Sequence, residues 1–133
     1  MSPKEVRELM DKAGRSLAAA ELLLQQGYND FAASRAYYAM FYAVQALLLT
    51  RNVRRTKHSG IIAAFNERFI RGGELPRNLF LFLRDAFEDR AEADYGLAEV
   101  SREQAGTHIS AGREFVEAIE HKISEWLRSA ETG

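Results

Sequence analysis

Proline is nearly absent from this chain, and its scarcity constrains the fold more than any other feature of the sequence. Only Pro3 and Pro76 occur in 133 residues. Both lie where a helix can begin, since proline is tolerated in the first helical turn. Apolar residues recur at steps of three and four through most of the chain, and no segment alternates as a half-buried strand does. The sequence therefore predicts an all-α fold.

Two long helices are expected within the first 50 residues. The first carries apolar residues on one face from Val6 to Leu24 and ends before Gly27, a residue suited to a C-terminal cap. The second, from about Phe31 to Thr50, is apolar on nearly every side, which predicts that it is the central helix. A stripe of small residues along it would let a neighbouring helix approach closely: Ala32, Ala36, Ala39, Ala43 and Ala46.

Further helices are expected after a polar, basic loop at Arg51–Lys57. A short helix should follow the loop and end near Gly72, a fourth should start at Pro76, and Ser101 with Gln104 forms a capping box for the last. We therefore predict a single domain over residues 1–133, folded as an antiparallel four- to five-helix bundle. A long apolar seam on the last helix could serve this bundle or a second copy in a homodimer: Ala105, Ile109, Gly112, Val116, Ile119, Ile123 and Trp126.

Composition narrows the range of functions. The chain has no cysteine, which excludes disulfides, thiol catalysis and cysteine-based metal sites. No apolar run reaches the ~20 residues of a membrane span, and the first residues lack the apolar core of a signal peptide. We therefore expect a cytoplasmic protein that makes no membrane contact. The net charge of −1 gives no reason to expect a general nucleic-acid binder.

The charge is unevenly distributed along the chain. Residues 51–84 contain eight basic and two acidic side chains, a net charge of +6. Residues 85–125 contain four basic and eleven acidic ones, a net charge of −7. Such a chain can present a basic surface to an anion and remain nearly neutral overall, although charged helix faces are also common without function. An anion site is expected near the 51–58 loop and near Arg35 and Arg90.

The common catalytic and cofactor motifs are missing from the sequence. The three histidines, His58, His108 and His121, are not spaced as a helical metal-binding pair. Gly72-Gly73 lacks the lysine and the preceding strand of a phosphate-binding loop. We therefore expect no metal site and no cofactor.

Charges within apolar stretches are more informative. Arg35 is the only charged residue between Asp30 and Arg51, and burying an arginine is costly unless it has a partner or faces a functional cleft. Arg90 and Asp94 lie one helical turn apart. They could form a simple ion pair at the end of the bundle. Alternatively, they could converge with Arg35 and a tyrosine, of which Tyr37, Tyr38 and Tyr95 are the neighbours, in a polar pocket.

Three motifs follow one another along the chain: Ala33-Ser34-Arg35-Ala36-Tyr37-Tyr38-Ala39-Met40-Phe41, then His58-Ser59-Gly60, then Arg90-Ala91-Glu92-Ala93-Asp94-Tyr95. Together they resemble the HEPN domain family, in particular its small stand-alone prokaryotic branch, over about Val6 to Leu127. The resemblance implies an all-α bundle that is usually a homodimer. It also implies a gene often encoded beside a minimal nucleotidyltransferase, in pairs of the toxin–antitoxin type.

Many members of that family look like metal-independent ribonucleases. Their signature is an arginine followed, after four to six residues, by a histidine that would transfer protons while the arginine stabilises charge. Here Arg90 is followed by Asp94 and Tyr95, and the next histidine is His108. Arg51 with His58 and Arg102 with His108 also have this spacing, and His58 is the one that matches a motif of the family.

Three functions therefore remain open. The first is a dimeric module that binds a nucleotide or RNA phosphate and partners a nucleotidyltransferase, because arginine suits phosphate and tyrosine offers a stacking face. The second is a ribonuclease toxin in which Arg90 and His58 are catalytic. The third is a helical scaffold whose polar residues are ion pairs only. The expected ligand-binding residues are Arg35, Tyr38, His58, Arg90, Asp94 and Tyr95.

Overall fold

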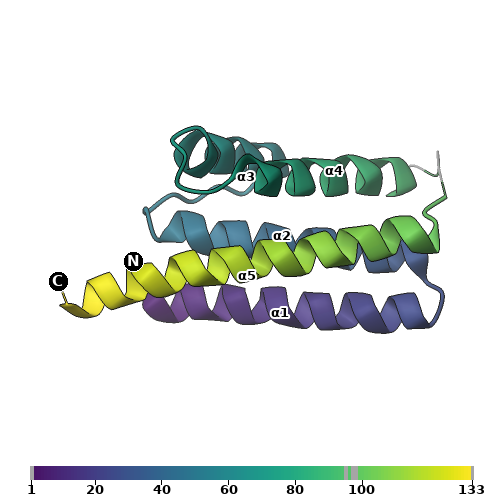
Figure 1. Ribbon diagram of the computed structural model, residues 1–133, viewed down its shortest axis with the longest axis horizontal. Helices are drawn as coiled ribbons and strands as arrows, with labels where there is room; N and C mark the ends of the chain where they lie inside the picture. Colours follow the sequence, from purple (N-terminus) through teal and green to yellow (C-terminus); the bar gives the residue numbers. More distant parts are fainter. Residues whose placement is uncertain (1, 95, 97–98, 133) are drawn as a thin grey trace.

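The computed structural model describes residues 2–94, 96 and 99–132 of the chain (Figure 1). No strand occurs in this part of the chain, and the all-α prediction is confirmed. The elements are α1 (Pro3–Gln25), α2 (Asn29–Leu49), α3 (His58–Phe65), the π-helical turn η1 (Asn66–Ile70), α4 (Arg77–Asp94) and α5 (Arg102–Thr132).

The long helices lie side by side in two layers (Figure 1). Helices α1, α2 and α5 run along the long axis, and α4 lies against α2 on the other side, with α3 at one end. Helix α2 contacts every other α-helix. The predicted helical bundle with a central second helix is therefore confirmed.

Helix α2 is central because most of its side chains are buried against the surrounding helices. All five alanines of the small-residue stripe are fully buried, and the larger side chains beside them, such as Met40 and Leu47, are also inaccessible. Burial of each large apolar side chain contributes roughly 1.5–3 kcal/mol to folding. Beyond the exposed first turn of α2, only a narrow strip of the helix remains partly accessible, and it includes Arg35, Tyr38 and Tyr42.

The apolar seam of α5 packs inside this chain's own bundle. Ala105, Ile109, Ile119 and Ile123 are almost completely buried. Helix α5 approaches α1 and α2 closely at Gly112, where an added Cβ would lie 3.1 Å from Leu17 Cδ2 and 3.6 Å from the Ala36 carbonyl oxygen. At the buried positions the seam is therefore not available to a second copy.

The helix ends follow local sequence signals closely. Gly27 has a φ of +85°, and the Tyr28 N–H donates to the Leu23 carbonyl, as in a glycine-capped helix end. The capping box is present, since the Ser101 hydroxyl accepts from the Gln104 N–H and the Gln104 side chain accepts from the Ser101 N–H. No local signal predicted that α3 would continue into the π-helical turn η1.

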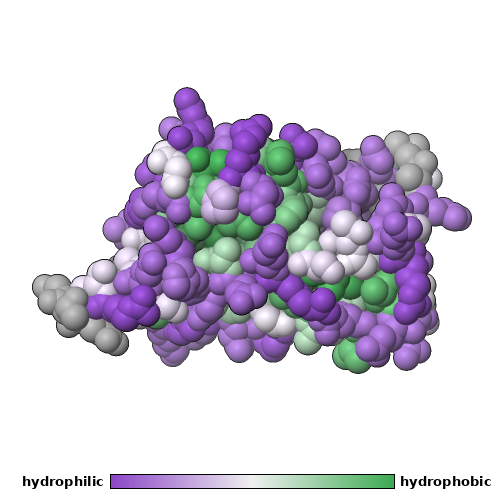
Figure 2. All heavy atoms as spheres, viewed as in Figure 1, coloured by the Kyte–Doolittle hydropathy of each residue, from purple (hydrophilic) through white to green (hydrophobic). Residues whose placement is uncertain are grey.

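Most of the surface in this view is hydrophilic (Figure 2), and apolar side chains show mainly in the recess between the α3–α4 layer and α5. Half-buried aromatic residues of α4, including Phe80 and Phe82, pack against the edge of the core. No helix in the described part of the chain is long and apolar enough to cross a membrane.

Candidate functional site

A compact group of aromatic and cationic side chains forms where the middle of α2 meets the start of α3 and the second half of α4. His58, the first residue of α3, stacks on Phe41 with ring centroids 4.2 Å apart. Its Nδ1 atom lies 2.6 Å from the Tyr37 hydroxyl oxygen. We define the His58 cluster as Arg35, Tyr37, Tyr38, Phe41, His58 and Arg90.

Two arginines from different helices lie on one tyrosine of this cluster. The Arg35 guanidinium carbon is 4.7 Å from the centroid of the Tyr38 ring, and that of Arg90 is 5.1 Å from the same centroid. The Arg90 guanidinium is also 5.4 Å from the centroid of the Tyr37 ring. A cation over an aromatic face is attracted by about 0.5–1 kcal/mol when exposed and more when desolvated. The fold thus concentrates two positive charges beside His58.

Only one of these arginines has a carboxylate partner among the described residues. Arg90 Nε lies 3.2 Å from Asp94 Oδ2, and the Arg90 side chain is 22% exposed while that of Asp94 is 51% exposed. Arg35 makes no ion pair in the described part of the chain. The ion pair considered from the sequence is therefore present along α4, and Arg35 and Arg90 both lie on Tyr38. A polar pocket formed by these residues stays a prediction. Tyr95, the sixth expected ligand residue, lies outside the described residues.

The two polar rings at the centre of the cluster are both uncharged at neutral pH. Tyr37 is fully buried, and this burial raises the pKa of its phenol, which therefore keeps its proton. Burial also lowers the pKa of His58, and the positive charge of Arg90 lowers that pKa further. The cluster thus presents guanidinium cations beside a neutral imidazole.

Sequence reasoning missed the part played by Tyr37. It noted both adjacent tyrosines but placed only Tyr38 in the site, because helical spacing does not tell which of two neighbours faces a residue from a distant segment. Phe41 was missed for the same reason, since its aromatic ring reads from sequence as an ordinary core residue. One signal was available: a tyrosine on the apolar central helix has a hydroxyl that needs a hydrogen-bond partner when it is buried.

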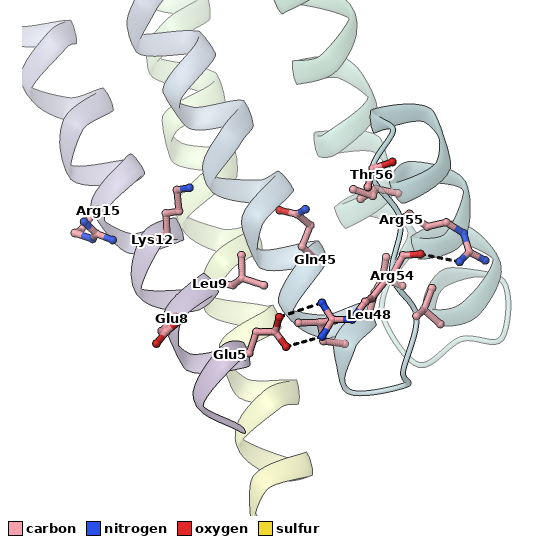
Figure 3. A pocket seen from close by; sticks show the side chains of 13 residues that line it. Glu5, Glu8, Leu9, Lys12, Arg15, Gln45, Leu48, Arg54, Arg55 and Thr56 are labelled. Atoms are coloured by element: carbon pink, nitrogen blue, oxygen red, sulfur yellow. Dashed lines mark hydrogen bonds and ion pairs between the residues drawn. The ribbon is translucent and has the colours of Figure 1, made fainter. Parts of the chain in front are cut away.

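Two arginines of the basic loop form ion pairs with carboxylates. Arg51 binds Glu74 with an N–O distance of 2.7 Å, and Arg54 binds Glu5 at the same distance. Figure 3 shows Glu5 of α1 reaching Arg54 across a groove of about 650 Å³ between α1, α2 and the loop. The nearby Arg55 side chain donates to the Arg54 carbonyl oxygen. The expectation of an anion site at the loop is therefore weakened, because two of its arginines already bind carboxylates.

The other histidines have different surroundings. His108 Nε2 lies 2.7 Å from Asp89 Oδ2 and joins α5 to α4, so its polar partner is a carboxylate rather than Arg102. His121 is exposed and lies 3.5 Å from Glu125. No group of three or more histidine, aspartate or glutamate side chains in the described part of the chain could hold a metal ion.

The fold and the cluster define a small all-helical protein with a cationic, aromatic site on its central helix. In a comparison with known protein families, the HEPN domain model matches residues 6–122. The chain therefore belongs to the HEPN family. The three motifs quoted above fall within the matched residues.

Relatives of similar length support this assignment. The chain is 40% identical over 114 residues to "Putative toxin MJ0142" of Methanocaldococcus jannaschii, covering 85% of this chain and 78% of that protein. It is 39% identical over 119 residues to a UPF0332 protein of Thermotoga maritima, covering 89% and 90%. The crystal structure of TT1696 from Thermus thermophilus has the same fold, with a TM-score of 0.74, 20% identity, and coverage of 89% of this chain and 98% of that chain.

Proposed function

We propose that this HEPN protein binds the phosphate of a nucleotide or of RNA at the His58 cluster, as the partner of a minimal nucleotidyltransferase in a toxin–antitoxin-like pair. The observation that carries the proposal is the convergence of Arg35 and Arg90 on Tyr38, within 4.7 and 5.1 Å of its ring centroid. Guanidinium groups match phosphate oxygens in charge and geometry. A tyrosine ring beside them offers a stacking face for a base.

Binding of adenosine monophosphate, with adenosine as the control that lacks phosphate, tests this proposal by calorimetry. Arg35→Met and Arg90→Met should each weaken binding about tenfold or more, since a hydrogen bond to a charged group contributes about 1.5–3 kcal/mol. Arg113→Met is the matched control, because Arg113 binds Glu21 on the exposed α1–α5 surface. If both site variants bind like the wild type, the phosphate is not bound at the His58 cluster. If the wild type itself binds no adenosine monophosphate, the result favours a helical scaffold.

The partnership has its own test. A tagged copy expressed in its native host should recover a small nucleotidyltransferase. Arg35→Met should leave the fold intact, so the same pull-down can be repeated with this variant. We also propose that the protein is a homodimer. Light scattering of the purified protein measures its molar mass and tests this directly. Failure to recover any nucleotidyltransferase would contradict the partnership without affecting phosphate binding.

A second function is a metal-independent ribonuclease toxin, in which Arg90 stabilises charge and His58 transfers a proton. It is favoured by the toxin name of the Methanocaldococcus jannaschii relative and by the position of Arg90 and His58, which both lie against the Tyr38 ring. RNA cleavage in the presence of a chelator, lost in Arg90→Ala and in His58→Ala, would support it. Wild-type protein that leaves single-stranded RNA intact would exclude it.

A further inference from the structure

The hydrogen bond between Tyr37 and His58 favours one direction. The Tyr37 side chain is fully buried, and in the described part of the chain its hydroxyl has no hydrogen-bond partner except His58 Nδ1. If Nδ1–H donated instead, the phenolic hydrogen would be buried without an acceptor, at a cost of about 1–3 kcal/mol. The phenol therefore donates, and Nδ1 accepts through its lone pair.

This direction fixes the form of the imidazole. A neutral histidine carries one N–H, so accepting at Nδ1 places the hydrogen on Nε2. Protonation would put a second hydrogen on Nδ1 and turn the phenolic hydrogen away from its only acceptor.

The groups around His58 also oppose its protonation. The titratable or charged residues facing the ring are Tyr37 and Tyr38 from α2 and Arg90 from α4, and Lys57 precedes it in the chain. No carboxylate in the described residues pairs with His58. The nearby carboxylate of Asp94 binds Arg90, so a protonated His58 would have no carboxylate partner of its own among the described residues.

We propose that Tyr37 is a positioning residue that holds His58 as a neutral Nε2–H donor, so that the cluster selects a ligand group that only accepts hydrogen bonds. The choice of a phosphate oxygen as the accepting group rests on the proposed function. The position of the imidazole hydrogen concerns the protein without ligand. In this state His58 has no free lone pair, so it cannot take a proton from an RNA 2′-hydroxyl, and the site binds phosphate without general-base catalysis by this residue.

Nitrogen NMR of histidine-labelled, ligand-free protein tests the tautomer directly. The resonances of His58 are assigned by their loss in His58→Gln. We expect the wild type to show protonated Nε2 and unprotonated Nδ1 across neutral pH. A wild-type spectrum with hydrogen on Nδ1, or with both nitrogens protonated at pH 7, would overturn the inference.

Two matched substitutions separate the hydroxyl from the ring. Tyr37→Phe removes only the donor, so both neutral tautomers should appear and the His58 pKa should rise. Tyr38→Phe removes the hydroxyl of the ring that meets His58 edge-on, with centroids 5.7 Å apart, and should leave the tautomer unchanged. Arg90→Gln should raise the pKa and retain the tautomer. Equal spectra for Tyr37→Phe and wild type would contradict the role of Tyr37.

These results can be told apart from those of the proposed function. An Nε2–H tautomer in a protein that fails to bind adenosine monophosphate would retain the positioning role and reject phosphate binding. An Nδ1–H tautomer in a protein that binds adenosine monophosphate would reject the positioning role and retain phosphate binding. If Tyr37→Phe does not fold, as judged by circular dichroism, the wild-type spectrum alone decides the tautomer.

Discussion

His58 and His108 both have a single polar partner, yet they occupy opposite electrostatic surroundings. His58 binds the buried phenol of Tyr37, beside the positive charge of Arg90. His108 binds the carboxylate of Asp89 where α5 packs against α4. Burial and the guanidinium of Arg90 lower the pKa of His58 and favour its neutral form. The difference shows that His108 links two helices, whereas His58 lies among aromatic and cationic side chains.

The comparison predicts that the contact between His108 and Asp89 stabilises the packing of α5 against α4. His108→Ala should lower the free energy of unfolding by about 2–3 kcal/mol, because it removes a side chain that is 9% exposed together with its hydrogen bond. Urea unfolding followed by circular dichroism measures the change. His121→Ala, at a side chain that is 76% exposed, is the control and should leave stability unchanged. Equal losses in the two variants would show that the His108–Asp89 pair does not hold the helices together.

A smaller effect should appear in the dependence of stability on pH. The pKa of His58 is lower in the folded protein than its ordinary value of 6.5, so below pH 6.5 the unfolded chain takes up the proton first. Stability should therefore fall as the pH drops below 6.5 and level off below the folded pKa.

His58→Gln isolates this contribution, since it should make unfolding less sensitive to pH between 7 and 5. The lowered pKa values of Glu5 and Glu74 act only as the pH falls through and below about 4.5, outside this window. Thermal unfolding in buffers of constant ionic strength gives the comparison. A wild type that gained stability on acidification from pH 7 to 5, relative to His58→Gln, would refute the lowered pKa.

The smallest effect is expected in the groove of Figure 3. Glu5→Gln breaks the ion pair with Arg54, whose side chain is 67% exposed, and exposed pairs contribute little. Stability and binding of adenosine monophosphate should both stay close to those of the wild type. Enhanced nucleotide binding in this variant would instead show that the freed Arg54 belongs to the anion site.

Much of the fold could be predicted from the sequence because its signals are local. Gly27 ends α1, Ser101 and Gln104 cap α5, and the apolar character of α2 marks it as the central helix. Each signal acts within one helical turn or along one helix face. The HEPN membership followed from motifs that keep their order along the chain, and the family match confirms it.

The site was only partly predictable. Arg35, Tyr38, His58, Arg90 and Asp94 were expected in one place, and the structure brings them together at the meeting point of α2, α3 and α4. The basic run after α2 suggested an anion site near the 51–58 loop. Ion pairs with Glu5 and Glu74 instead engage two of its arginines, and neither partner was evident from sequence spacing.

The sequence by itself determined the all-helical class, the end of α1, the start of α5 and the types of side chain present in the His58 cluster. Only the tertiary structure decided that Tyr37 rather than Tyr38 bonds to His58, and that His108 belongs with Asp89. The physical reason is that helix formation depends on neighbours within a few residues, whereas these contacts depend on how each helix is rotated against another. That rotation is set by the packing of the whole core.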